Sequence, residues 1–132
     1  MVSTPPFMIV LDLPYPPSIN NYWIASGHRR FISKRGQLFR QEVQIACLQR
    51  RVPKLGSQSL MVHIILKPRN KKLMDIDNCA KAILDSLEHA NVFDSDVQVQ
   101  RLLIERGDPV PGGGCQVIVE VIPSSLEENP QG

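Results

Sequence analysis

Cysteine and histidine are scarce in this chain of 132 residues, and their spacing rules out several kinds of site. The cysteines are odd in number, widely spaced and free of any Cys-x-x-Cys pair: Cys47, Cys79 and Cys115. This pattern indicates neither a disulfide framework nor a zinc site. The three histidines form no spaced ligand set, and none is close enough in sequence to Cys79 to activate it. We therefore read Cys79 as a small packing residue.

Long apolar runs are also absent. No segment is apolar over the length that a bilayer requires, and the N-terminus lacks the basic-then-apolar pattern of a secretory leader. We expect a reduced, cytoplasmic protein with no membrane partner. The length suits one compact domain over residues 1–132, with the polar, proline-containing segment 123–132 as a flexible tail.

The net charge of +2 is small, but its distribution is uneven. From Arg29 to Lys72 there are twelve Lys or Arg and one acid, Glu42, which makes a local charge of +11. From residue 73 onward eleven acids outnumber three basic residues. This asymmetry predicts a basic face beside an acidic cluster, an arrangement that suits a phosphate backbone. A solvated helix surface is the alternative for the part from Arg29 to Lys54.

The acidic half opens with two aspartates one residue apart, Asp75 and Asp77, and Asp96 follows further on. Carboxylates of this kind bind divalent metal ions, and the basic run of residues 67–72 lies directly before them. Together they predict a metal-dependent nuclease. Apolar residues at helical spacing predict a helix over about residues 78–90: Ile76, Ala80, Ile83, Leu84, Leu87 and Ala90.

Two structural alternatives remain open for these charged residues. Asp75 or Asp77 could be the N-cap of the predicted helix, although only one residue can hold that position. Lys81 and Asp85 follow Asp77 on the polar face, so Lys81 could form an exposed ion pair with Asp77 or Asp85.

Three blocks of the sequence resemble the RusA family of Holliday junction resolvases. The first reads Asp-Ile-Asp-Asn-x-x-Lys-x-x-x-Asp-x-Leu over residues 75–87, followed by Asp-Val-Gln-Val over residues 96–99. The second, residues 13–23, resembles the family's Pro-Pro-Ser-x-Asn opening with aromatics after it. The third and weaker block, residues 32–39, resembles a Ser-x-x-Gly segment that leads into the first helix.

The resemblance implies roles for individual residues. It implies that Asp75, Asp77 and Asp96 are catalytic and hold Mg²⁺, with Mn²⁺ able to substitute, and that Lys81 is the functional lysine. The family often carries two adjacent aspartates at the third site, whereas this chain has Asp94-Ser95-Asp96. The residues after Asp96 favour it, and Asp94 is the less favoured alternative.

The implied activity is that of a magnesium-dependent endodeoxyribonuclease that resolves four-way DNA in recombination and repair. The two-fold symmetry of a junction calls for matched nicks, which a homodimer provides. A non-catalytic branched-DNA-binding protein and a metal-nucleotide-dependent transferase are the competing classes. The predicted DNA-binding residues are basic: Lys67, Arg69, Lys71, Lys72, Arg29, Arg30, Lys34 and Arg35. Tyr22 or Trp23 could also stack on an unpaired base at the branch point.

The element pattern predicts an α+β domain in which a mixed sheet packs helices on one face. We expect strands over residues 7–13, 60–66, 97–105 and 115–122, a loop through Arg30, and a helix that Ser33 caps and that runs to about Arg51. The glycine-rich residues 107–114 are expected to form a hairpin turn between the last two strands. We expect residues 91–95 to return Asp96 to the other aspartates within one chain, with donation by a partner subunit as the alternative.

Overall fold

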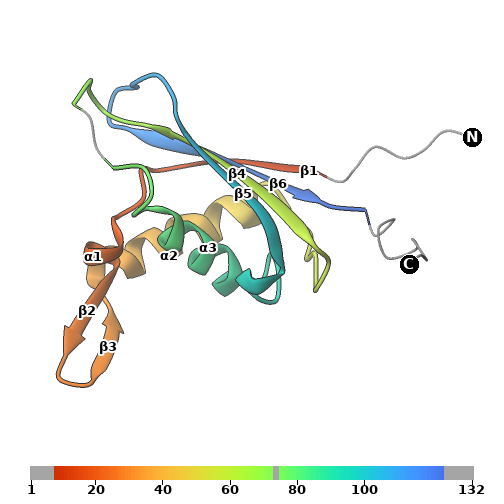
Figure 1. Cartoon of the computed structure of the whole chain (residues 1–132), viewed down its shortest axis with the longest axis horizontal. Helices are drawn as coiled ribbons and strands as arrows, with labels where there is room; N and C mark the ends of the chain where they lie inside the picture. The colour runs from red at the N-terminus through yellow and green to blue at the C-terminus, as the bar shows by residue number, and fades with distance from the viewer. Residues whose placement is uncertain (1–7, 73–74, 124–132) are drawn as a thin grey trace, which may run out of the picture.

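The structure, a computed structural model, describes residues 8–72 and 75–123. Its elements follow one another along the chain as shown in Figure 1. They are β1 (Met8–Leu13), α1 (Ile19–Tyr22), β2 (Trp23–Ser26), β3 (Arg29–Ile32), α2 (Lys34–Gln49), β4 (Leu60–Lys67), α3 (Ala80–His89), the 3-10 turn η1 (Asp96–Gln98), β5 (Val99–Arg106) and β6 (Gly114–Val121).

Four strands form one mixed sheet in the order β1-β6-β4-β5. The central strand β4 runs antiparallel to β6 and parallel to β5, and β1 is antiparallel to β6. The predicted hairpin between the last two strands is therefore wrong, because β4 lies between them. The glycine-rich connection crosses the end of β4 instead, where the Gly107 N–H donates to Leu66 O at 2.7 Å and the Val110 N–H donates to Pro68 O at 2.9 Å.

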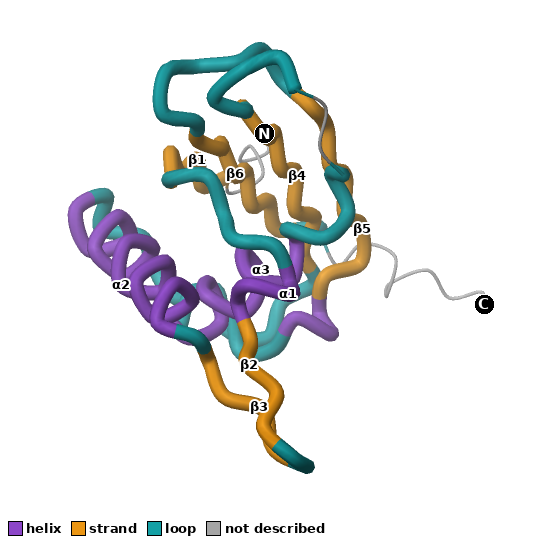
Figure 2. The backbone as a smooth tube through the Cα atoms, turned by 90° about the vertical axis from the view of Figure 1, so that its left-hand side faces the viewer, coloured by secondary structure: helices purple, strands orange, loops and turns teal. Residues whose placement is uncertain are grey.

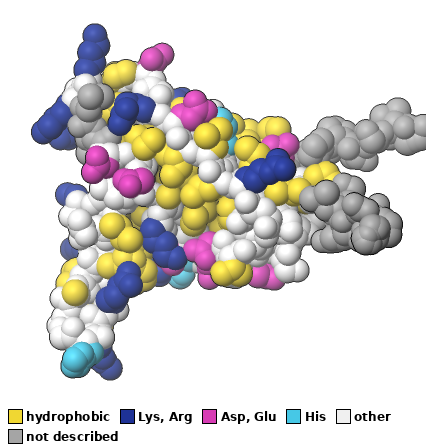
Figure 3. Space-filling view, in the orientation of Figure 1, with side chains coloured by type: hydrophobic (Ala, Val, Ile, Leu, Met, Phe, Trp, Pro, Cys, Tyr) yellow, Lys and Arg dark blue, Asp and Glu magenta, His cyan; other side chains and the backbone are white. Residues whose placement is uncertain are grey.

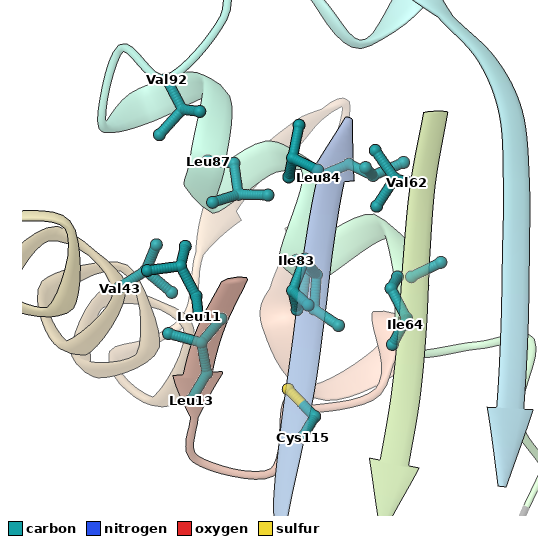
Figure 4. Close-up of a cluster of buried hydrophobic side chains, with 14 of the residues drawn as sticks. Leu11, Leu13, Val43, Val62, Ile64, Ile83, Leu84, Leu87, Val92 and Cys115 are labelled. Carbon is teal, nitrogen blue, oxygen red and sulfur yellow. The ribbon is translucent and has the colours of Figure 1, made fainter. Parts of the chain in front are cut away.

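The core lies between this sheet and the helices. In β4 the buried residues alternate with half-buried ones, as the period-two pattern predicts, and Leu60, Val62, Ile64 and Leu66 are all at most 1% exposed. Figure 4 shows side chains of α2 and α3, such as Val43 and Leu87, facing those of the sheet. The predicted α+β class with helices on one face of a mixed sheet is confirmed (Figure 1).

Both long helices were predicted, with small differences at their ends. Ser33 is the N-cap of α2, and its hydroxyl accepts from the Gly36 N–H at 2.9 Å, as expected. The N-cap of α3 is Cys79, without a side-chain cap hydrogen bond. Capping by Asp75 or Asp77 is therefore wrong, and neither carboxylate is explained by a structural role at this helix end.

The loop predicted to run through Arg30 is wrong over its last part, because two strands form between Trp23 and Ile32. These strands form the β2–β3 hairpin, in which Trp23 pairs with Ile32 and Ser26 with Arg29. Gly27 begins the turn with φ 64°, a conformation that glycine adopts without strain. Figures 1 and 2 show the hairpin projecting from the helical layer, away from the sheet.

The three cysteines are buried and form no disulfide. Burial raises the pKa of all three thiols, to about 11 for Cys47 and about 12 for Cys115, so they stay protonated and pack as small apolar groups.

Within the described ranges no helix is long and apolar enough to cross a membrane. Most of the predicted flexible tail, residues 124–132, lies outside the described residues.

Candidate active site

The two neighbouring aspartates lie in the irregular segment that leads into α3. Asp75 and Asp77 are both exposed. The residue after them is fixed, because Asn78 O accepts from the Ile19 N–H of α1 at 2.7 Å. The proline-rich opening of the chain and the acidic segment are thus held side by side, although about 60 residues separate them in the sequence.

Asp96 lies against α3 of the same chain. Lys81 Nζ is 2.9 Å from Asp96 Oδ2, and the Asp96 N–H donates to Glu88 Oε1 at 3.2 Å. Both side chains remain partly accessible, with 45% of Lys81 and 25% of Asp96 exposed. The hydrogen bond to Asp96 raises the pKa of Lys81, which keeps its ammonium charged at neutral pH.

The connection that returns Asp96 to α3 is well anchored. Val92 and Phe93 are 2% and 1% exposed, so they pack into the core. The nearly buried Gln98 side chain accepts from the Ser95 N–H at 2.9 Å and donates to Gln58 O at 2.6 Å. Ser95 and Gln98 thus form a capping box for the 3-10 turn η1. Because of this turn, β5 begins at Val99 and not at residue 97 as expected, and the backbone on either side of Asp96 is fixed.

The three predicted metal ligands are the aspartates Asp75, Asp77 and Asp96. Their carboxylate oxygens are the donors that Mg²⁺ and Mn²⁺ prefer, so the residue types fit such an ion. In the parts of the chain that the structure describes, however, no three His, Cys, Asp or Glu side chains gather around one point. Asp96 is paired with Lys81, and residues 73–74, directly before Asp75, lie outside the described ranges.

Asp85 contacts side chains of α1 and α2 and does not pair with Lys81. Arg40 Nη2 of α2 is 2.6 Å from Asp85 Oδ2, and the Tyr22 hydroxyl donates to the same carboxylate. Burial would raise the pKa of Asp85, but the hydrogen bonds from Tyr22 and Arg40 outweigh it and lower this pKa. The alternative of a Lys81 ion pair with Asp77 or Asp85 is therefore wrong. Sequence patterns gave no signal for this cluster, because its three members come from three separate helices.

A cavity of about 700 Å³ opens beside Asp75. Its walls come from the proline-rich opening, the first half of α2, the segment after β4 and the glycine-rich connection. The chain positions around it are Pro14, Tyr15, Pro16, Pro17, Ser18, Asn21, Arg35, Leu38, Phe39, Glu42, Pro68, Arg69, Asp75, Asn78, Cys79, Gly112 and Gly113. Sequence reasoning missed this cavity, since it is built from four segments that are distant in the chain.

The predicted basic residues lie in two parts of the chain. Arg69, Lys71 and Lys72 are exposed in the segment between β4 and the aspartates, while Lys67 is half-buried at the end of β4. The others lie on the β2–β3 hairpin and at the start of α2: Arg29, Arg30, Lys34 and Arg35. In Figure 3, many Lys and Arg side chains lie at the left-hand end of the molecule, the end that carries the β2–β3 hairpin. Asp and Glu side chains lie between them.

The two aromatic candidates for base stacking already pack against other side chains of the protein. Tyr22 is 0% exposed, so the prediction that it stacks on an unpaired base is wrong. Trp23 is half-buried, with the Arg30 guanidinium 4.7 Å from its ring centroid and Tyr22 against it edge-on. Stacking by Trp23 stays a prediction that would require Arg30 to move.

The sequence matches the family model described as Endodeoxyribonuclease RusA over residues 14–122. The chain belongs to this family. It is 38% identical over 101 residues to the crossover junction endodeoxyribonuclease of Enterobacteria phage HK97, which covers 76% of this chain and 84% of that protein. It is 26% identical over 110 residues to the enzyme of the same name from Escherichia coli K12, covering 83% of this chain and 91% of that protein. The enzyme of Enterobacteria phage 82 is similar to the same extent, 26% over 110 residues. The family resemblance predicted from the sequence blocks is confirmed.

Proposed function

We propose that this protein is a divalent-metal-dependent endodeoxyribonuclease that resolves four-way DNA junctions by paired, symmetric nicks. The observation that carries the proposal is the placement of three aspartates and one lysine along α3 and the segment before it. Asp75 and Asp77 precede the helix, and Asp96 is held to its first turn through Lys81. Exposed cations flank this set, which is the arrangement that a phosphodiester substrate requires.

Asp75, Asp77 and Asp96 would hold Mg²⁺, or Mn²⁺ in its place, by their carboxylate oxygens. When bound, such an ion lowers the pKa of a water molecule and stabilises negative charge on the reacting phosphate. Lys81 would hold the scissile phosphate. An ammonium group has three donors, so Lys81 can bind a phosphate oxygen while Asp96 still accepts one hydrogen bond.

The basic residues would supply affinity rather than chemistry. Arg69, Lys71 and Lys72 lie between β4 and the aspartates, so a phosphate backbone bound there passes close to Asp75. Contacts of this kind are independent of base sequence and position the strand on the protein.

A homodimer with one site per subunit would supply the two matched nicks. Support comes from β5, which forms an edge of the sheet, and from its residues Leu102 and Leu103, each 44% exposed. Edge strands with exposed apolar residues favour pairing with a second chain. Light scattering of the purified protein would give a dimeric mass, and Leu103→Arg would shift it toward the monomer.

A synthetic four-way junction with labelled strands tests the proposal. With Mg²⁺ the protein should nick two opposing strands at matching positions and spare linear duplex, and a chelator should abolish this. Asp77→Asn should be inactive, whereas Asp12→Asn, an exposed aspartate on β1, should cleave like the wild type. Tight binding without cleavage in any divalent metal would favour the non-catalytic branched-DNA-binding class. Sugar-nucleotide turnover without DNA cleavage would favour the transferase class.

A further inference from the structure

The cavity beside Asp75 has the size and surface of a nucleotide site. Its volume of about 700 Å³ lies within the usual range of ligand pockets, roughly 300–1,000 Å³. Tyr15, Phe39 and Leu38 supply aromatic and apolar surface, together with three prolines of the N-terminal block. Such surfaces stack on a nucleobase regardless of its identity.

Two cations border the same cavity. Arg35 comes from the first turn of α2, and Arg69 comes from the segment after β4. A guanidinium binds phosphate oxygens in a bidentate manner. A strand that passes Asp75 could therefore have phosphates held by these two arginines and a base directed into the cavity between them.

The segments that form the walls of the cavity are joined to one another by backbone hydrogen bonds and close packing. The Ile19 N–H donates to Asn78 O at 2.7 Å, and the Val110 N–H donates to Pro68 O at 2.9 Å. Gly113 has φ 75°, and a Cβ there would lie 3.4 Å from Tyr15 Cβ. The glycine-rich connection thus packs closely against the proline-rich opening, and the cavity is formed before any ligand binds.

Glu42 is an acidic residue in the wall of the cavity, and binding of phosphate does not explain its presence there. It is the single acid between Arg29 and Lys72, it lines the cavity, and it forms no ion pair with any residue in the described ranges. A carboxylate on a DNA-binding surface repels phosphates and lowers affinity. It can, however, accept a hydrogen bond from the exocyclic amine of a base, as carboxylates do from cytosine N4.

We propose that this cavity binds one unstacked nucleotide of the DNA strand next to the phosphate at Asp75. Glu42 selects a base that carries an exocyclic amine. This inference rests on the proposed junction cleavage and adds a source of sequence preference at the cut.

Occupation of the cavity can be measured with 2-aminopurine placed at successive positions of the cut strand. The Asp77→Asn protein is used so that the strand stays intact. One position adjacent to the cut should brighten several-fold on binding, because the probe leaves the base stack. Leu38→Trp in the same background should fill the cavity and remove the brightening while junction binding persists. Leu48→Trp, at a 71% exposed position of the same helix, is the matched control and should leave the brightening unchanged.

The reading role of Glu42 has its own test in cleavage-competent protein. Junctions that differ only in the base at the brightened position should be cut at rates that differ by about tenfold between amine-bearing bases and thymine, for one discriminating contact. Glu42→Ala should lose this preference. Glu42→Gln should retain part of it, because the amide oxygen still accepts. If Glu42 acted only through its negative charge, Glu42→Ala and Glu42→Gln would lose the base preference equally. Glu120→Gln, on β6, is the control and should leave the base preference unchanged.

The outcomes separate this inference from the proposed function. If junctions are cut symmetrically but no position brightens, or brightening survives Leu38→Trp, the cavity does not hold a nucleotide. If brightening occurs but base preference is unchanged in Glu42→Ala, the selecting role of Glu42 is overturned. If junctions are neither bound nor cut, the proposed function itself fails.

Discussion

Lys81 Nζ lies 2.9 Å from Asp96 Oδ2, joining the first turn of α3 to η1 within one chain. The pair neutralises a carboxylate that is expected to bind metal and places a cation where a phosphate is expected. Metal affinity and cleavage should therefore both depend on this contact.

Removal of the Lys81 ammonium should affect metal binding and cleavage in opposite directions. Lys81→Met frees Asp96 from its ion pair, so Mn²⁺ should bind several-fold more tightly, as measured by calorimetry. Junction cleavage should nevertheless fall by about 100-fold or more, because a positioned charge at the phosphate is lost. The control is Lys54→Met, at an exposed position in the connection after α2. Equal loss of metal affinity and activity would show that the pair supports the fold instead.

Asp96 should act in the same subunit as Asp75. If heterodimers of Asp75→Asn and Asp96→Asn subunits are forced to form, each subunit lacks one carboxylate and both sites should stay inactive. Nicking of a single strand would mean that one complete site had formed across the dimer. That result would show that Asp96 is donated to the partner, against its contact with Lys81 of the same chain.

Binding and cleavage should separate at Asp77. Asp77→Asn should abolish cleavage and leave junction affinity equal or higher, because a negative charge next to phosphate is removed. Gel-shift titration measures this. A fall in affinity in parallel with activity would mean that the carboxylate, through its metal ion, contributes to binding as well as to chemistry.

The exposed lysines before the aspartates should contribute to the salt dependence of binding. Lys71→Glu with Lys72→Glu should weaken binding and reduce the slope of log affinity against log salt by about 1–2, since fewer counterions are released. The control is Lys54→Glu, at an exposed position in the connection after α2. An unchanged slope would place the DNA away from this segment.

The cluster of Tyr22, Arg40 and Asp85 should stabilise the fold in a pH-dependent way. Because the pKa of Asp85 is lower in the folded state, its stabilisation is present above the unfolded-state pKa, about 3.9, and is lost as the pH falls through the folded-state value. Asp85→Asn should therefore lower the free energy of unfolding at pH 7 by about 1–3 kcal/mol, and the difference should shrink below about pH 4. Urea denaturation at both pH values measures this, and a pH-independent difference would contradict the assignment.

The sequence by itself determined the elements whose cause is local. Alternation in β4 follows from burial of one strand face, the apolar stripe of α3 from burial of one helix face, and the start of α2 from the Ser33 hydroxyl. The three family blocks point to Asp75, Asp77 and their neighbours through residue identity and spacing alone. Each of these signals lies within one continuous stretch of the chain.

Only the tertiary structure decided which distant residues meet. Asp85 lies 63 residues from Tyr22 and 45 from Arg40, and its choice of these partners over Lys81 follows from the packing of α1 and α2 on α3. The same holds for β4, which separates the last two strands, and for the cavity formed by four segments. Local periodicity states which face of an element is buried, but it does not state what covers that face. The partner is set by the packing of the whole chain, where burial of the common core decides between alternatives that look equal in sequence.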